Sequence, residues 1–364
     1  MANIQKRANG NYTALIRLAG YPSESETFTS LREAKDWAQR READIKSVRK
    51  TGVVATKYTL GQAINKYIED VAPTHAGGTH EARRLRALAK SLPTARILDD
   101  FTAQFWEDWA TKRGKMTVQN NPSKTVSGAT VRRELCDLSL VFKHARRKLR
   151  WITSNPFTDV ERPPSGESRS RLITQAEASA MFEHLNYTRG VAPVSIGQQV
   201  AAAFDLALET GLRSGEITGE AATKIRPAKA GLLWENVHLD KRYVHLPKTK
   251  NGTARDVPLR PAAVEILESL LGINDGEVFA MYSQTRDAYF RKARKQAGLD
   301  GFTFHDARHT AATSIAGTLI QVANSSPAQA VLELCKIFGW KDPKYALVYF
   351  NPDIAELAAR MMDK

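Results

Sequence analysis

Hydrophobic positions recur at helical spacing through the middle of the chain, residues 56–162. In TLGQAINKYIEDV, Leu60 and Ile64 begin an apolar stripe, and Thr59 precedes it as a candidate N-cap. The segments TARILDDFTAQFWEDWATKR and SGATVRRELCDLSLVFKHARRKLRW continue the helical pattern, and the lysine-rich stretch TKRGKMTVQNNPSKTVSG between them is predicted to be a loop. We therefore expect a helical domain over residues 56–162.

Residues 1–50 show strand-like alternation followed by a helical period. Apolar residues alternate with others between Asn11 and Leu18, and residues 26–29 are a candidate return strand. Ser30 then caps a predicted helix, whose apolar stripe consists of Leu31, Ala34, Trp37, Ala38 and Ile45. The result is a small sheet backed by one helix. It could serve as a dimerisation or packing module, or it could contact DNA.

Residues 171–364 combine both patterns. A helix is predicted to begin near Thr174, and a second helix ends at Gly211, which fits a left-handed C-terminal cap. The short strands LLWENVHL, RYVHLP and ARDVPL follow, and Asn251-Gly252 predicts a hairpin between the last two. Before this part, NPFTDVERPPSGESRSR is rich in Pro, Ser and Gly, so we expect the domain boundary near residues 163–170. The predicted fold class is multidomain and mainly α with small β-sheets.

The net charge adds a candidate partner. The 364 residues carry a formal charge of +14, which favours a polyanion such as nucleic acid, although ribosomal, membrane-surface and heparin-binding proteins have similar charges. Basic side chains gather on one side of the last helix of the middle domain, opposite its apolar stripe. The candidate DNA-binding residues there are Arg132, Arg133, Lys143, Arg146 and Arg147. An ordinary solvated helix face is the alternative.

The cysteines and the lack of long apolar runs indicate the cellular compartment. The two cysteines, Cys136 and Cys335, are too few for a disulfide framework and form no metal-ligand pair. The N-terminus lacks the apolar run of a signal peptide, and no stretch approaches the roughly 20 apolar residues of a membrane span. We therefore expect a cytoplasmic protein without membrane association.

Several positions carry side chains suited to phosphate chemistry. Arg213 follows the Gly211 cap with Glu216 three residues later, and Lys250 lies beside the predicted hairpin turn. In HDARHTAAT, His305 and Arg308 share one face of a predicted helix. A capping salt bridge, a solubilising lysine and a structural histidine are the alternatives. No His-Glu-x-x-His pattern is present, so the usual zinc site is excluded.

The segment GWKDPKYALVYFNP places Tyr345 and Tyr349 four residues apart. Tyrosines at this spacing share a helix face, so on spacing alone both are expected to pack in a core.

The order of these motifs is more informative than any one of them. It runs from Arg213 in ETGLRSGE through Lys250 and His305-x-x-Arg308 to Trp340 and Tyr349. This order resembles the catalytic domain of the tyrosine recombinases, the phage-integrase family, over residues 171–364. Residues 56–162 resemble the family's helical core-binding domain, and residues 1–50 resemble the small arm-binding domain of many integrases. The resemblance implies a mixed α/β catalytic domain and site-specific DNA recombination.

The resemblance also implies roles for individual residues. Arg213 and Arg308 would bind the scissile phosphate, and planar guanidinium groups suit bidentate phosphate contact on chemical grounds as well. Glu216 would orient Arg213. Lys250 would protonate the leaving 5′ oxygen, with Lys248 as the competing lysine.

The remaining roles concern the proton and the nucleophile. His305 would accept the tyrosine proton or hydrogen-bond the phosphate, with His309 in a supporting position. Trp340 stands where most members have histidine; its indole can donate a hydrogen bond but cannot carry a proton. Tyr349, nine residues after Trp340, would be the nucleophile, and Tyr345 would pack beside it.

The implied reaction integrates or excises a phage or mobile element through a 3′-phosphotyrosine, without metal, ATP or cofactor. The resemblance implies that it takes place in a bacterial or phage-infected cell. Its implied partners are double-stranded DNA sites, a homotetramer on that DNA, and possible DNA-bending accessory proteins. Residues 218–231 and 317–331 are longer than the family pattern, and we expect surface loops there. The alternatives are a DNA-binding regulator that lost catalysis, a metal-dependent nuclease or transposase, and a resolvase or inversion enzyme of the same family.

Overall fold

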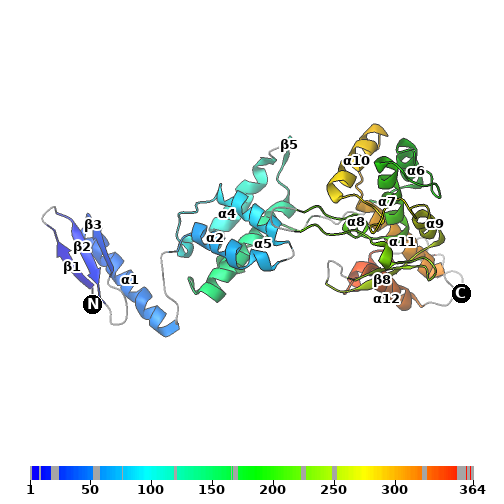
Figure 1. Ribbon diagram of the computed structural model, residues 1–364. Coiled ribbons are helices and arrows are strands. Elements are labelled where there is room, and N and C mark those ends of the chain that lie inside the picture. Colours follow the sequence, from blue (N-terminus) through cyan, green and yellow to red (C-terminus); the bar gives the residue numbers. More distant parts are fainter. Residues whose placement is uncertain are drawn as a thin grey trace. The chain divides into compact units, whose positions relative to one another are not determined.

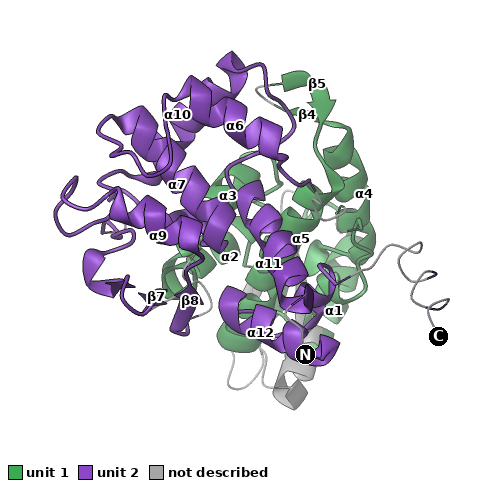
Figure 2. Ribbon diagram, turned by 90° about the vertical axis from the view of Figure 1, so that its right-hand side faces the viewer, with its two compact units in different colours: residues 1–167 green, residues 168–364 purple. Residues whose placement is uncertain are grey.

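The computed structural model describes residues 2–7, 10–17, 24–51, 58–75, 77–118, 121–164, 166, 171–222, 227–247, 252–321, 326–350, 358 and 361. The chain forms two compact units, residues 1–167 and 168–364, coloured separately in Figure 2. The division falls within the segment rich in Pro, Ser and Gly, and each unit is described here by itself.

The N-terminal part of unit 1 is a three-stranded antiparallel sheet with one helix. Its strands are β1 (Ala2–Lys6), β2 (Tyr12–Ile16) and β3 (Glu24–Phe28), in that spatial order, followed by α1 (Leu31–Thr51). Ala14 packs with Ala34 and Ala38 between sheet and helix, and the Ser30 side chain accepts a hydrogen bond from the Glu33 backbone N–H. The polar strand β1 was not predicted, and Leu31 is exposed rather than part of the apolar stripe.

The rest of unit 1 is a helical bundle with its own core. Its helices are α2 (Leu60–Asp70), α3 (Gly78–Ala89), α4 (Ala103–Lys115) and α5 (Gly128–His144), which continues as a π-helical turn, Ala145–Leu149; three-residue 3-10 turns cover Ala72–Thr74, Leu98–Asp100 and Pro156–Thr158. Thr59 caps α2 as expected, and the predicted stripe of α5 is buried.

Two predictions for this bundle were wrong. The helix expected over residues 94–113 begins only at Ala103, because Thr102 accepts the N-cap hydrogen bond and the preceding residues form a 3-10 turn that buries Leu98. The expected loop after α4 contains an antiparallel hairpin, β4 (Thr117–Val118) and β5 (Asn121–Thr125). Its exposed strands lack the apolar alternation by which a strand is normally recognised.

Unit 2 has its other helices arranged around α7 (Ile196–Thr210) (Figure 1). Its other elements are α6 (Gln175–His184), α8 (Ser214–Ile217), a 3-10 turn (Trp234–Asn236), β6 (Val237–His238), β7 (Tyr243–Leu246), β8 (Arg255–Pro258), α9 (Pro261–Glu268), α10 (Ser283–Gln296), α11 (Asp306–Gln321), α12 (Pro327–Phe338) and α13 (Lys344–Leu347). Helix α7 (Ile196–Thr210) is buried along most of its length. Its alanines let α11 pack closely against it.

The predicted starts and caps of these elements hold, with one exception. Thr174 caps α6, Gly211 ends α7 with φ 66°, and β7 pairs with β8 as an antiparallel hairpin. The strand predicted over LLWENVHL is mostly a 3-10 turn, and only Val237–His238 pair as β6.

The two segments that are longer than the family pattern are not simple loops. Around residues 317–331, α11 continues to Gln321 and α12 begins at Pro327, so most of the described residues in this segment are helical. In the other segment, Thr218 is fully buried and the Glu220 and Lys229 backbones pair. Throughout the described ranges, we find no helix that combines the length and apolarity required to traverse a bilayer.

Candidate active site

The junction between α7 and α8 places Arg213. Gly211 adopts a left-handed conformation, and a Cβ there would lie 2.5 Å from Phe338 Cε1, so the turn requires glycine. The Thr210 hydroxyl then accepts a hydrogen bond from the Leu212 backbone N–H at 3.2 Å. Arg213 follows at the N-cap position of α8, where its guanidinium donates to Glu216 Oε1 at 2.9 Å.

Glu216 joins two arginines. Besides Arg213, it accepts hydrogen bonds from both terminal nitrogens of Arg255, at 3.0 and 2.7 Å. Burial alone would raise the pKa of Glu216, but the hydrogen bonds and charge of Arg255, and then of Arg213, hold this pKa below its ordinary value. Glu216 is thus a buried carboxylate that neutralises part of a strongly positive site, in addition to orienting Arg213.

Arg255 was missed in the sequence, although a signal was available. It lies on β8, where Arg255 and Val257 face inward and the residues between and after them face outward. Because side chains alternate along a strand, an arginine two residues from an inward valine must also point inward. An arginine at such a position indicates a buried anionic partner.

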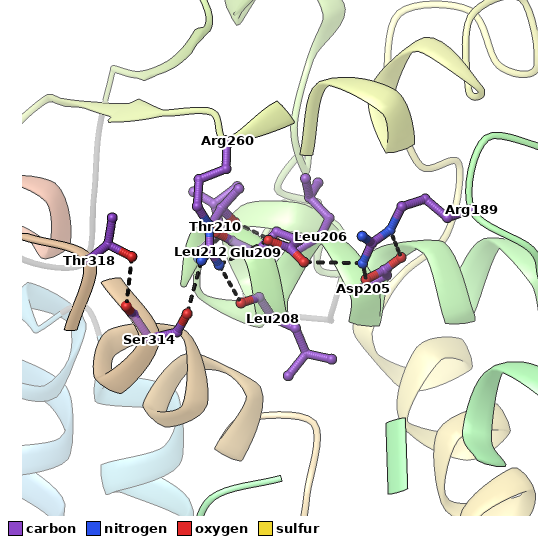
Figure 3. A network of polar contacts seen from close by, with 10 residues as sticks. All are labelled: Arg189, Asp205, Leu206, Leu208, Glu209, Thr210, Leu212, Arg260, Ser314 and Thr318. Atoms are coloured by element: carbon purple, nitrogen blue, oxygen red, sulfur yellow. Dashed lines mark hydrogen bonds and ion pairs between the residues drawn. The ribbon is translucent and has the colours of Figure 1, made fainter. Parts of the chain in front are cut away.

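A polar network fixes the end of α7 that leads into this junction (Figure 3). Arg260 donates to the Glu209 carbonyl at 3.1 Å and to the Leu208 carbonyl at 3.3 Å, which satisfies carbonyls at the end of the helix. Its other terminal nitrogen reaches Ser314 Oγ on α11 at 2.9 Å. Arg189 bridges the Asp205 and Glu209 carboxylates. The network therefore ties α7 to α11 two residues before Gly211.

Helix α8 is also held in place by Arg286 of α10. Arg286, which is 4% exposed, donates to the Ser214 carbonyl at 2.8 Å and to the Thr218 hydroxyl at 2.6 Å. Its guanidinium also lies 4.8 Å from the centre of the Phe304 ring. These contacts limit the movement of the short helix that presents Arg213.

Arg308 links three helices at the site. Its guanidinium donates to the carbonyl of Gly211 and, at 2.9 Å, to that of Phe338, so it connects the ends of α7 and α12 to α11. Burial, followed by the charges of Arg213 and Arg255, lowers the pKa of Arg308 to about 9, which leaves it charged at neutral pH. The mutual influence of these groups places them in one electrostatic cluster.

His305 lies immediately before α11 and is an exposed residue. Desolvation by the surrounding protein, followed by the charge of Arg308, lowers the pKa of His305 below its ordinary value. The imidazole is therefore favoured in its neutral form at pH 7.

Tyr349 reaches the same cluster from the segment after α13. Its hydroxyl is hydrogen-bonded to Nδ1 of His309 at 2.8 Å. Its ring stacks on Trp340, with centroids 5.5 Å apart and planes within 3°. Burial raises the pKa of Tyr349, and the charge of Arg308 opposes this rise.

The structure separates the two tyrosines. Tyr345 is 52% exposed, with Lys344 Nζ 5.2 Å from its ring centre, so the expectation that it packs beside the nucleophile was wrong. The buried residue of α13 is Ala346, which joins Ala312 and Ala316 of α11 in a small apolar cluster. In α13, Ala346 thus occupies the buried position, whereas Tyr345 is exposed to solvent.

The site therefore brings together most of the predicted residues: Arg213, Glu216, His305, Arg308, His309, Trp340 and Tyr349. Lys250 and Lys248 lie outside the described residues. Within the described ranges, no group of three or more His, Cys, Asp or Glu side chains is arranged to hold a metal ion.

The predicted DNA-binding residues belong to unit 1. Arg133, Lys143 and Arg147 are exposed, and Arg146 is half-buried. Arg132 donates a hydrogen bond to the Pro163 carbonyl at 2.8 Å, so this guanidinium holds the start of the interdomain segment.

The chain resembles known proteins over most of its length. Residues 171–354 match the model of the phage integrase family. A putative integrase/recombinase of Haemophilus influenzae is 32% identical over 302 residues, covering 82% of this chain and 88% of that protein. A lambda integrase dimer bound to a COC′ core site aligns with a TM-score of 0.61 and 19% identity, over 96% of this chain and 94% of that one. A lambda integrase tetramer bound to a Holliday junction aligns with a TM-score of 0.57 and 18% identity, over 94% and 96%.

The chain belongs to the phage integrase family, the tyrosine recombinases, and it is a site-specific DNA recombinase. The similarity to the lambda integrase structures shows that the chain has the integrase-like fold. The predicted family and the predicted multidomain, mainly helical architecture are thus confirmed.

Proposed function

We propose that the chain integrates or excises a phage or mobile element by cleaving and rejoining DNA through a 3′-phosphotyrosine at Tyr349. The observation that carries this proposal is the position of the Tyr349 hydroxyl, held by His309 and stacked on Trp340 within the field of Arg308. A phenol with a pKa of about 10 is a weak nucleophile at neutral pH, so it needs such a field and a proton acceptor.

The arginines would bind the scissile phosphate. Two carbonyls occupy part of the Arg308 donor set, and a guanidinium has five N–H groups, so further donors can reach a phosphate oxygen. Arg213, oriented by Glu216, supplies the second planar fork. Their charges would offset the charge that develops on the phosphoryl oxygens as the transition state forms.

The remaining roles follow the family. Lys250 would protonate the 5′ oxygen as it leaves, His305 would hydrogen-bond the phosphate or take part in proton transfer, and Trp340 would donate its indole N–H to a phosphate oxygen. Because the phosphotyrosine conserves the energy of the broken phosphodiester bond, the reaction would need neither ATP, a metal nor another cofactor.

We propose three functional domains. Residues 171–364 would catalyse strand exchange, residues 56–162 would bind the core DNA site, and residues 1–50 would bind arm-type DNA. Basic side chains of the helical domain would contact the phosphate backbone of this DNA: Arg132, Arg133, Lys143, Arg146 and Arg147. Exchange between two duplexes involves four strands, so four protomers would assemble on DNA in the cytoplasm, with DNA-bending proteins as possible accessories.

The decisive experiment uses a nicked suicide substrate that carries the element's own end sequence, in buffer with EDTA. We expect an SDS-resistant protein–DNA adduct that is absent for Tyr349→Phe and retained for Tyr345→Phe. An adduct that requires Mg²⁺ would favour a metal-dependent nuclease or transposase. No adduct on any end sequence would favour a DNA-binding regulator without catalysis.

A further inference from the structure

The partner of the Tyr349 hydroxyl is His309. The 2.8 Å contact joins the hydroxyl to Nδ1, and a neutral imidazole with an unprotonated Nδ1 accepts this hydrogen bond. His309 lies on α11 one turn after His305, with ring centroids 6.1 Å apart. The two histidines therefore have different neighbours. The charge of Arg308 acts on His305, whereas His309 contacts the phenol itself.

The surroundings hold this contact in place. The Tyr349 backbone N–H donates to the Ala346 carbonyl at 2.9 Å, and Ala346 is fully buried in the cluster that includes Ala312 and Ala316 of α11. His309 lies one turn before Ala312 and Thr313 on the same rigid helix. Stacking on Trp340 fixes the plane of the phenol. The distance between hydroxyl and imidazole is thus set by packed elements rather than by a loose side chain.

We infer that His309 is the general base for Tyr349, a role that the family pattern alone would give to His305. This inference rests on the proposed function, in which Tyr349 is the nucleophile. As the tyrosine oxygen forms its bond to phosphorus, the O–H bond breaks and its proton passes to His309 Nδ1. The bond from phosphorus to the 5′ oxygen breaks, and that oxygen takes its proton from the acid assigned to Lys250.

The reverse step uses the same groups. When a 5′ hydroxyl attacks the phosphotyrosine, its oxygen bonds to phosphorus and its proton passes back to the neutral amine assigned to Lys250. The bond from phosphorus to the tyrosine oxygen breaks, and the protonated His309 returns its proton to the departing phenolate. Cleavage and rejoining are therefore expected to depend on His309 to similar extents. A positioned base or acid typically contributes a factor of about 10²–10⁴ in rate.

The variant His309→Asn distinguishes two possible roles of His309: a general base, and a residue that only positions the phenol. The Asn amide oxygen lies near the place of Nδ1 and accepts a hydrogen bond from the phenol, but it cannot hold a proton at neutral pH. We expect His309→Asn to bind DNA and to unfold as the unchanged chain does, and to cleave the suicide substrate about 10²–10⁴ times more slowly. If this variant cleaves as fast as the unchanged chain, His309 only positions the phenol and the inference is wrong.

A second measurement includes the further variant His309→Gln and changes the acidity of the phenol instead of removing the base alone. Incorporation of 3,5-difluorotyrosine at position 349 lowers the phenol pKa and so reduces the need for a base. The rate deficit of His309→Asn and of His309→Gln should then shrink by at least about tenfold, whereas that of His305→Gln should not. Equal deficits in both tyrosine backgrounds, or rescue of His305→Gln alone, would overturn the assignment.

The same set separates this inference from the proposed function. If the unchanged chain forms its adduct at a residue other than Tyr349, the proposed function fails. If the adduct forms at Tyr349 and His309→Asn is fully active, only the role of His309 fails.

Discussion

Removing the charge of Glu216 should destabilise unit 2 strongly. Glu216→Gln keeps the size of the side chain but leaves Arg213 and the buried Arg255 without their common carboxylate. Arg255 is 8% exposed and makes both of its carboxylate contacts with Glu216, at 2.7 and 3.0 Å. Breaking a buried ion pair by removing one partner costs about 3–5 kcal/mol, and the nearby charge of Arg308 favours the upper part of that range.

The assay is urea unfolding of the full chain, followed by pulsed hydrogen exchange and mass spectrometry. Peptides from residues 196–217 report on unit 2 alone, so unfolding of unit 1 does not mix with the signal. The matched control is Asp256→Asn. Asp256 is next to Arg255 on β8 and lies on the outer face of that strand. Asp256 pairs with His245 at 2.7 Å but is 61% exposed, so this change should cost about 0–1 kcal/mol.

The reasoning would be refuted if the two variants lowered the free energy of unfolding equally. A double change, Glu216→Gln with Arg255→Gln, adds a further check. If the loss comes from an uncompensated buried guanidinium, the double variant should be less destabilised than the sum of the two single variants.

Three further predictions concern Glu216, Gly211 and Arg133. Because the folded-state pKa of Glu216 is lowered, its stabilisation is present above the unfolded value of about 4.3 and is lost as pH falls through the folded value; Glu216→Gln should flatten this part of an acid titration of stability. Gly211→Ala should cost more than Gly272→Ala in the same urea assay, because both have positive φ but only the Cβ at position 211 meets another residue. Arg133→Gln should reduce the salt slope of DNA binding by about 1, measured by fluorescence anisotropy.

Local signals in the sequence predicted much of the fold. Thr59 and Thr174 were recognisable as N-caps and Gly211 as a C-cap, because each residue type satisfies a local backbone requirement that does not depend on distant contacts. The strand β1 and the hairpin β4–β5 were missed because their residues are mostly polar and exposed, so pairing rather than burial defines them.

The candidate site shows a similar division. The order of motifs was sufficient to select Arg213, Arg308 and Tyr349, but the partners of these residues depend on the folded chain. Arg255 reaches Glu216 only after β8 pairs with β7, and its inward position could have been inferred from strand alternation. The contact between His309 and Tyr349 could not, because it depends on how Ala346 packs against α11.

The central claim is that Tyr349 becomes covalently attached to DNA. The direct measurement is tandem mass spectrometry of the trypsin- and nuclease-treated adduct from the suicide substrate. Cleavage after Lys344 and Arg360 yields one peptide, residues 345–360, that contains both tyrosines, so fragment ions distinguish them in a single spectrum. We expect the nucleotide mass on Tyr349 and an unmodified Tyr345; a nucleotide on Tyr345, or on a residue outside this peptide, would contradict the account.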